Sequence, residues 1–206
     1  MRNLSYSILR LISLAFFKAI NRLEVLNADR VPDTGGVIVA SNHLSYLDPP
    51  VMGAALKRRP VFMAKESLFS MPVTGRILRT FCVPVRRGCP RPSTIKETAR
   101  RLRRGEVVVI FPEGGLTEDG SRLDPRRGVG MIAAMLGCCV VPARIDGTER
   151  ALPVGSLFLK PSRIRVSFGE PIVVERGNPG KDVHMQMTRE IMEAIEGLQC
   201  SMQRAK

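Results

Sequence analysis

Short apolar runs and helical patterns alternate along most of this chain. The apolar runs are rich in Val, Ile, Phe and Cys, which is typical of buried strands, and they span 37–40, 60–64, 81–85, 107–111, 138–145 and 164–168. Helical patterns lie between and after them, at 51–56, 68–80, 93–104, 128–136 and across the C-terminal stretch. Because elements that alternate in this way build parallel sheets, we predict an α/β fold with a largely parallel central sheet flanked by helices.

An apolar stripe at helical spacing marks the C-terminal stretch, and it predicts a helix packed on the core. Its members are Val183, Met187, Ile191, Ile195 and Leu198. His184 lies beside the stripe, and we expect no catalytic role for it. A chain of 206 residues is long enough for one substantial core, so a second full domain is not expected.

The N-terminal stretch reads NLSYSILRLISLAFFKAINRL and is apolar, but Arg10 and Lys18 interrupt it. It is too short for a comfortable membrane span, and it lacks the small-residue cleavage site of a signal peptide. Its apolar residues share one helical face: Leu4, Ile8, Leu11, Ile12, Ala15 and Ala19, with Phe16 and Phe17 beside them. Such a helix either lies in a membrane interface or packs on the core. We predict a membrane-associating helix over 1–24, followed by the main domain over 25–206.

The charge balance favours anionic partners. Thirty-two Lys and Arg residues against nineteen Asp and Glu give a net charge of +13. The excess is concentrated between Arg76 and Arg104, where ten basic residues accompany one acid, Glu97. An anionic membrane face, a phosphorylated substrate or nucleic acid would suit this charge. Only 5% of the residues are aromatic, which argues against a module that stacks nucleic-acid bases.

The five cysteines show no C-x-x-C spacing, and the two histidines lie far apart in the sequence. A zinc-binding set is therefore not expected. Cys82 and Cys139 sit in apolar runs, where a free thiol behaves as a small hydrophobic side chain. We expect reduced thiols in a cytoplasmic setting.

The stretch Gly35–Pro50, GGVIVASNHLSYLDPP, carries the first candidate chemistry. An apolar run ends in a polar loop that holds His43 and Asp48, and two prolines then open a helix. In open α/β sheets, ligands bind at the carboxyl ends of strands. One interpretation makes His43 structural and Asp48 a helix cap. The other pairs them, so that the carboxylate fixes the imidazole tautomer and the second ring nitrogen acts as a general base.

Further polar groups follow other predicted strands. Glu113 and Gly114 come directly after the run at 107–111, and Lys65 and Arg87 also lie just past strand ends. The glycine allows close approach of a substrate, and the two cations suit a phosphate. Together with His43 and Asp48, these residues predict a site at one edge of the sheet.

One glycine-rich stretch resembles a nucleotide-binding motif but lacks the required context. Residues 128–133, GVGMIA, match a loose dinucleotide-binding fingerprint, but LDPRR precedes them where a strand would be required. We therefore expect no nucleotide there. The chain also lacks a P-loop and a G-x-S-x-G elbow, which argues against an NTPase or an α/β-hydrolase.

With these residues assembled, the chain resembles the 1-acylglycerol-3-phosphate acyltransferase family of lysophospholipid acyltransferases. NHLSYLD at 42–48 resembles the family's catalytic N-H-x-x-x-x-D block, and PVRRG at 84–88 resembles its second block. FPEG at 111–114 is similar to the third block, F-P-E-G-T-R-S, and VVPA at 140–143, followed by Gly-Thr, is similar to the fourth. MAKE at 63–66 resembles the family's lysine-bearing segment.

The resemblance implies an enzyme with a glycerol-phosphate acyltransferase-like fold over 25–206. His43 and Asp48 would be catalytic, Glu113 would bind the acceptor's glycerol, and Lys65 and Arg87 would hold its phosphate. Gly114 would be a further substrate-binding residue. The reaction would move an acyl group from acyl-coenzyme A or acyl carrier protein to lysophosphatidic acid. Phosphatidic acid for phospholipid biosynthesis would be the product. No metal or cofactor is implied, and the enzyme would be peripheral or monotopic on the cytoplasmic face of an anionic membrane.

One departure affects the acceptor. Gly115, Leu116 and Thr117 stand where the third block usually has Thr, Arg and Ser, so an expected phosphate contact is missing. Arg122, Arg126 and Arg127 are the nearby arginines that could replace it.

Two other interpretations stay open. Another lysolipid, such as lysophosphatidylethanolamine, would be an alternative acceptor, and a non-enzymatic basic nucleic-acid-binding module is the alternative from a different class.

Overall fold

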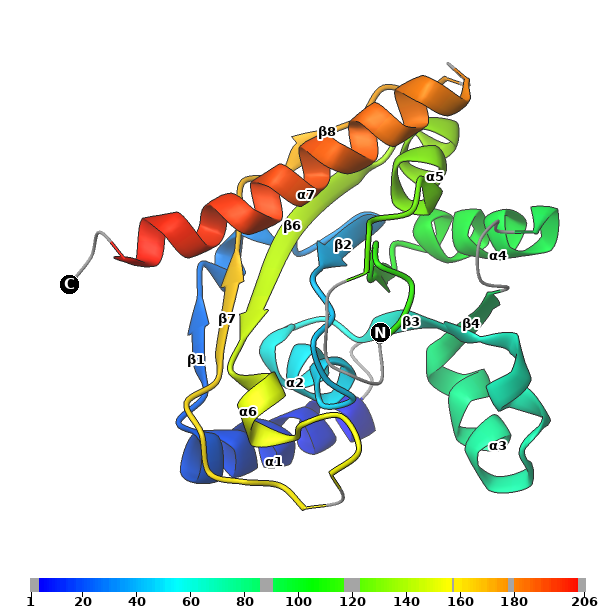
Figure 1. The fold of residues 1–206 in the computed structure, drawn as a ribbon. Helices are drawn as coiled ribbons and strands as arrows, with labels where there is room; N and C mark the ends of the chain where they lie inside the picture. Colours follow the sequence, from blue (N-terminus) through cyan, green and yellow to red (C-terminus); the bar gives the residue numbers. More distant parts are fainter. Residues whose placement is uncertain (1–3, 86–90, 117–122, 157, 178–179, 204–206) are drawn as a thin grey trace.

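A central sheet carries helices on both of its faces (Figure 1). The computed structural model describes residues 4–85, 91–116, 123–156, 158–177 and 180–203. In this part of the chain, eight strands form one sheet in the order β1-β7-β6-β2-β5-β3-β4, and β8 pairs with β6. The strands are β1 Glu24–Leu26, β2 Val37–Ser41, β3 Pro60–Lys65, β4 Cys82–Val85, β5 Val107–Ile110, β6 Cys139–Asp146, β7 Arg165–Phe168 and β8 Ile172–Val173.

The sheet is largely parallel, as the sequence pattern predicts. Strands β2 to β6 all run in one direction, whereas β7 and β8 pair antiparallel with β6, and β1 runs parallel to β7. Ala40 in β2 pairs with Ile110 in β5 on one side and with Pro142 in β6 on the other. The carboxyl ends of the three central strands therefore meet at one edge, where the predicted site residues follow them.

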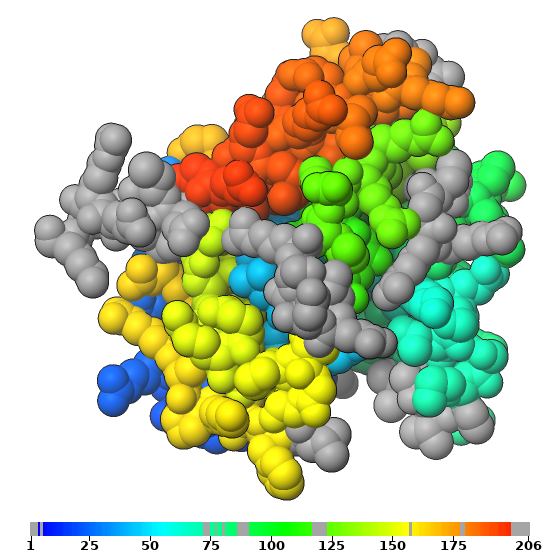
Figure 2. Space-filling view, viewed as in Figure 1, coloured from blue at the N-terminus to red at the C-terminus, as the bar shows by residue number. Residues whose placement is uncertain are grey.

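Seven α-helices are described: α1 Leu4–Asn21, α2 Asp48–Ala55, α3 Pro72–Phe81, α4 Pro92–Arg103, α5 Gly128–Leu136, α6 Thr148–Ala151 and α7 Lys181–Gln203. Two 3-10 helices, η1 Ala28–Arg30 and η2 Glu66–Ser70, complete the elements. Helix α7 crosses the upper part of the molecule in Figure 2, and α3 lies at the lower right.

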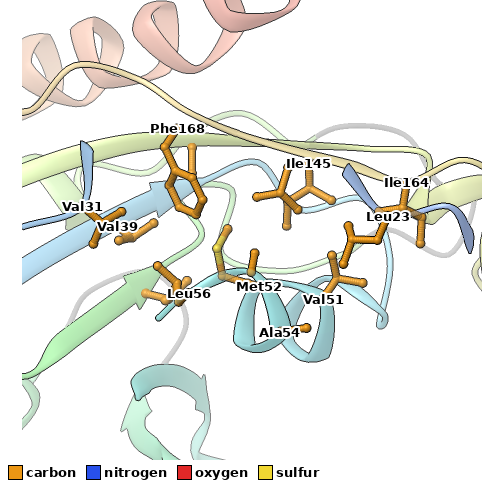
Figure 3. Close-up of a cluster of buried hydrophobic side chains, with 14 of the residues drawn as sticks. Leu23, Val31, Val39, Val51, Met52, Ala54, Leu56, Ile145, Ile164 and Phe168 are labelled. Atoms are coloured by element: carbon orange, nitrogen blue, oxygen red, sulfur yellow. The ribbon is translucent and has the colours of Figure 1, made fainter. Parts of the chain in front are cut away.

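Alternate side chains of the central strands enter two separate cores. Val37 and Val39 of β2 point into the core that contains α2, which Figure 3 shows around Met52 and Phe168. Ile38 and Ala40 point into the other core, which α5 and α7 cover. This period of two, with both faces apolar, explains why the strand reads as a continuous apolar run.

The predicted helix over 68–80 is wrong in detail, because the chain forms η2 and then α3 with a break at Met71. Met71 adopts an extended conformation (φ −75°, ψ 134°), which the following proline favours by disfavouring helical backbone before it. Phe81 is the last residue of α3, not the first residue of a strand. The next helix begins at Pro92, one residue before the predicted pattern at 93–104, and Arg91 is at its N-cap position.

The buried face of α7 is also rotated from the predicted stripe. Val183 is 45% exposed, whereas His184, Thr188, Ile191 and Ile195 are buried. Thr188 belongs on this face because its hydroxyl accepts a hydrogen bond from the backbone N–H of Gly130 and donates one to the carbonyl of His184. Polar contacts that the apolar pattern cannot reveal thus set the rotation of the helix.

Helix α1 lies outside α2 and leaves most of its apolar face uncovered by the rest of the described chain (Figure 1). Leu4, Ile8, Leu11, Ile12 and Phe16 are exposed. The opposite side docks on the domain: Phe17 is in the core, and the Tyr6 hydroxyl donates a hydrogen bond to the carbonyl of Gly53 at 2.9 Å. Burial raises the pKa of Tyr6 to about 12. None of the described helices is both long and apolar enough to cross a membrane.

Helix packing explains the glycine-rich stretch at 128–133. A Cβ atom at Gly130 would lie 2.2 Å from the carbonyl oxygen of His184 in α7, so only glycine fits at this crossing. Residues 123–127, which precede α5, contain no strand. The two glycines therefore belong to a close approach of helices, and the expectation that this is not a dinucleotide-binding turn agrees with the fold.

We predict that Gly130→Ala lowers the free energy of unfolding by about 3 kcal/mol, because the added methyl group must push α5 and α7 apart. Gly197→Ala in α7 is the matched control. A Cβ there has no neighbour within 4 Å, so the substitution is expected to raise stability by about 0.5–1 kcal/mol. Urea denaturation of both variants tests this, and equal effects would contradict the close packing.

Candidate active site

His43 and Asp48 form a hydrogen-bonded pair at the carboxyl end of β2. Nδ1 of His43 lies 2.8 Å from Oδ2 of Asp48. The same oxygen accepts the backbone N–H groups of Leu44 at 2.6 Å and Ser45 at 2.9 Å. The Asp48 side chain is fully buried, whereas that of His43 keeps 13% exposure. The carboxylate therefore fixes both the loop and the ring.

The pairing determines which ring nitrogen is available. A carboxylate accepts from the protonated Nδ1, which leaves Nε2 of His43 as the proton acceptor. Asp48 is the first residue of α2, with Leu47 at the N-cap position, and the described hydrogen bonds of its carboxylate go back to the preceding loop. The alternative in which Asp48 only caps the helix is therefore wrong. Pro49 and Pro50 occupy the first helical turn, as predicted.

Asn42 holds this loop on the neighbouring strand, a role that sequence reasoning missed. Its side-chain amide donates to the carbonyl of Ile145 at 2.7 Å and accepts the N–H of Ile145 at 2.7 Å. These bonds continue the β2–β6 ladder for one further step after β2 ends. The signal available in the sequence was an Asn immediately after an apolar run.

Ser45 ties the middle of the loop to a distant segment. Its hydroxyl donates to the carbonyl of Leu152 at 2.7 Å and accepts the N–H of Leu47 at 3.2 Å. The loop is thus anchored at Asn42, Ser45 and Asp48, with His43 between the anchors. Such support leaves the imidazole little freedom to turn.

Phe111 covers the His43 ring on the β5 side. The two rings stack with centroids 4.2 Å apart and planes 19° from parallel. The parallel pairing of β2 with β5 brings these residues together, because each follows its strand at the same edge. Stacking further restricts the ring to one orientation.

A largely apolar pocket of about 330 Å³ opens beside this ring. Its apolar wall comes mainly from β3, η2, α3, β4 and α5, through Phe62, Met63, Leu68, Leu78, Cys82, Val85, Ile110, Val129 and Ile132. Burial raises the pKa of the Cys82 thiol to about 11. Among the described lining residues, the ionisable groups besides Cys82 and Tyr46 are His43, Lys65 and Arg126, and none is an acid.

The predicted substrate-binding residues do not all lie in the pocket wall. Lys65 and Gly114 line the pocket with His43. Glu113 is 1% exposed and is not part of the pocket wall. Arg87 lies outside the described residues. Its contact with a phosphate, like the acceptor contacts of Lys65, Glu113 and Gly114, stays a prediction.

The backbone donors near the pocket are partly occupied. Gly114 has φ +73°, a conformation that favours glycine, and its N–H donates to the carbonyl of Phe111 at 3.0 Å. The N–H groups of Leu44 and Ser45 bind Asp48. These three groups are therefore not free to hold an oxyanion in this structure. In the described part of the chain, no three His, Cys, Asp or Glu side chains gather into a set that could hold a metal ion.

Fold and site together define an α/β protein with an imidazole in the wall of an apolar pocket and a buried carboxylate that holds it. The Acyltransferase family model matches residues 22–146 of the chain. This protein therefore belongs to the Acyltransferase family, and the resemblance inferred from its motifs is confirmed.

Similar proteins include "1-acyl-sn-glycerol-3-phosphate acyltransferase" of Bacillus subtilis (strain 168), which is 31% identical over 73% of each chain. The chloroplastic "LPAT1" of Arabidopsis thaliana, with the same activity in its name, is 33% identical over 73% of this chain and 44% of its own. The crystal structure of the "1-acyl-sn-glycerophosphate (LPA) acyltransferase, PlsC" from Thermotoga maritima has a TM-score of 0.77. It is 23% identical, covering 96% of this chain and 81% of that one, and it confirms the predicted fold.

We predict that Asn42→Ala lowers the free energy of unfolding by about 2–4 kcal/mol, because it leaves the buried N–H and carbonyl of Ile145 without partners. Ser41→Ala is the control. That buried hydroxyl makes one longer bond, 3.2 Å to the carbonyl of Asn42, and its loss should cost about 1 kcal/mol or less. Thermal unfolding of both variants tests this, and an equal cost would contradict the anchoring role of Asn42.

Proposed function

We propose that this protein transfers a fatty acyl group from an acyl thioester to the free hydroxyl of 1-acylglycerol-3-phosphate. The observation that carries the proposal is the His43 imidazole in the wall of the apolar pocket, held by the buried Asp48 at 2.8 Å between Nδ1 and Oδ2. The names of the similar proteins in Bacillus and Arabidopsis support this acceptor. The donor is acyl-coenzyme A or acyl carrier protein, and phosphatidic acid is the product.

The chemistry follows from the imidazole. Nε2 of His43 takes the proton of the acceptor hydroxyl while that oxygen attacks the thioester carbonyl carbon. The buried Asp48 carboxylate stabilises the imidazolium that forms. When the tetrahedral intermediate collapses, the C–S bond breaks, and the thiolate leaves with the proton that the imidazolium returns. The products are an ester and a free thiol.

Transfer is direct, without an acyl-enzyme. A thioester is already reactive, so no protein nucleophile is required. Cys82 is a free thiol in the pocket wall, but with a pKa of about 11 it is protonated near neutral pH and is a poor nucleophile.

The apolar part of the pocket suits an acyl chain, and its cationic part suits a phosphate. Lys65 is exposed and lines the pocket, and we keep it, with Arg87, as a phosphate contact. Glu113 remains our candidate for ordering the glycerol side, although its carboxylate lies behind the wall. Assays with lysophosphatidic acid and lysophosphatidylethanolamine, each with both thioester donors, decide the acceptor and the donor.

The release of free thiol from acyl-coenzyme A on adding a lysolipid separates this function from that of a nucleic-acid-binding module. No thiol release with any acceptor or donor would overturn the proposal.

We predict that His43→Ala lowers kcat by about 10²- to 10⁴-fold with little change in substrate binding, since only the base is lost. Asp48→Asn should act on the same step, because an amide can favour the wrong tautomer and cannot stabilise the imidazolium. The double variant should therefore be little slower than His43→Ala alone. Steady-state kinetics of the three variants tests this.

His184→Gln is the matched control for losing an imidazole. His184 lies on the buried face of α7 and does not line the pocket, so kcat should be kept. A near-normal kcat for His43→Ala, or losses at 43 and 48 that simply multiply, would make the pair structural.

We also propose that the exposed face of α1 places the enzyme on a membrane, at the cytoplasmic face where thiols stay reduced. The exposed apolar residues of α1 form a continuous helical face, and the chain carries a net charge of +13. Apolar insertion and attraction to anionic lipids would then act together.

We predict that the double variant Ile8→Ser, Ile12→Ser lowers partitioning into neutral phosphatidylcholine vesicles by at least about 10-fold, because two exposed apolar side chains are lost. Val173→Ser is the control, since Val173 is exposed on β8 and not on α1. Vesicle flotation measures both. Unchanged partitioning of the double variant would show that α1 is not the docking surface.

Anionic vesicles measure the electrostatic contribution to membrane binding separately from the apolar contribution. The double variant should keep part of its binding to them, and high salt should remove that remaining part. Salt-insensitive binding would contradict a role for the positive charge.

A further inference from the structure

We infer that Arg126 binds the phosphate group of the acceptor and so determines its head-group specificity. The inference rests on the proposed acyl transfer to a phosphate-bearing lysolipid. Leu116 and Arg126 both line the pocket, so its wall has an apolar side chain at 116 and a guanidinium at 126.

Arg126 is fixed at the pocket by its backbone. Its N–H donates to the carbonyl of Pro112 at 2.9 Å, which pins the segment before α5 to the turn after β5. Its side chain then crosses that turn at Gly114. A Cβ atom at Gly114 would lie 3.3 Å from Cδ and 3.4 Å from Nε of Arg126, so the absent side chain makes room for the guanidinium.

The guanidinium is a cation without a counter-ion in the described structure. Arg126 is half-buried, and no described residue makes a salt bridge or a side-chain hydrogen bond with it. Arg101, which is also half-buried, pairs with Glu97, and the buried Arg144 pairs with Asp146. A half-buried charge beside an apolar wall is costly unless a partner arrives, and here the ligand is the partner.

The chemistry of the wall selects a phosphate monoester. Two described cationic side chains, Lys65 and Arg126, line the pocket with His43, and no described acid does. A guanidinium fork matches two phosphate oxygens at once, whereas a lysine offers a single point charge. A dianionic phosphate therefore binds better than a zwitterionic head group, which brings its own cation.

The test is Arg126→Ala, assayed with lysophosphatidic acid and with 1-monoacylglycerol, which has the same glycerol and acyl chain but no phosphate. We expect the KM for lysophosphatidic acid to rise about 10- to 100-fold, because a charge-assisted contact that persists into the transition state contributes uniform binding. The KM values for 1-monoacylglycerol and for the acyl donor should change less than about twofold. Arg126→Lys should keep part of the preference.

The matched control is Arg127→Ala. It removes the same charge from the next residue, which does not line this pocket, so the KM for lysophosphatidic acid should stay within about twofold. Leu116→Arg in the Arg126→Ala background adds a guanidinium to the same wall and should restore much of the lost preference. Circular dichroism and thermal unfolding confirm that each variant is folded.

The outcomes separate this inference from the proposed function. If wild type acylates lysophosphatidic acid but Arg126→Ala leaves its KM unchanged, or raises the KM of both acceptors equally, Arg126 is not the phosphate contact. If wild type acylates no lysolipid, the proposed function fails. Calorimetry with lysophosphatidic acid in neutral detergent micelles then tests the Arg126 contact independently of catalysis. A lower affinity of Arg126→Ala than of wild type supports the contact. Equal affinities, or no binding by wild type, overturn it.

Discussion

One buried oxygen atom organises the site. Oδ2 of Asp48 accepts hydrogen bonds from His43 Nδ1 and from the N–H groups of Leu44 and Ser45. A carboxylate without water is unstable unless such bonds compensate it, so the loop must keep the shape that provides them. That shape is also the one that directs the second nitrogen of His43 to the pocket side. The stability of the buried charge and the orientation of the base therefore depend on the same contacts.

The parallel sheet supplies the remaining geometry. β2 lies between β5 and β6, so the loop after β2 meets Phe111 on one side and Ile145 on the other. Because β2, β5 and β6 run parallel, Phe111 after β5 and Ile145 near the end of β6 lie at the same edge of the sheet as this loop. The site is thus a consequence of strand direction as much as of residue type.

The positions of the exposed apolar side chains and of the pocket cations fit a lipid substrate. Helix α1 docks through Tyr6 and Phe17 and presents its other side outward, while the pocket combines an apolar wall with Lys65 and Arg126. Both features are unfavourable in the isolated chain, because apolar side chains of α1 stay in contact with water and Arg126 has no described counter-ion. A lipid surface and an anionic acceptor would each supply the missing partner.

Local patterns of the sequence determined the strands and the α/β class, because apolar runs mark buried strands whatever surrounds them. They also offered the pairing of His43 with Asp48, which lie five residues apart, as one of two interpretations. Tertiary structure alone decided the rest. The Asn42–Ile145 bonds join residues 103 apart, the burial of Glu113 and the face of α7 depend on packing, and Arg126 lines the pocket where its side chain packs against the turn at Gly114. Such contacts have no period in the sequence, because they depend on which elements the folded chain brings together.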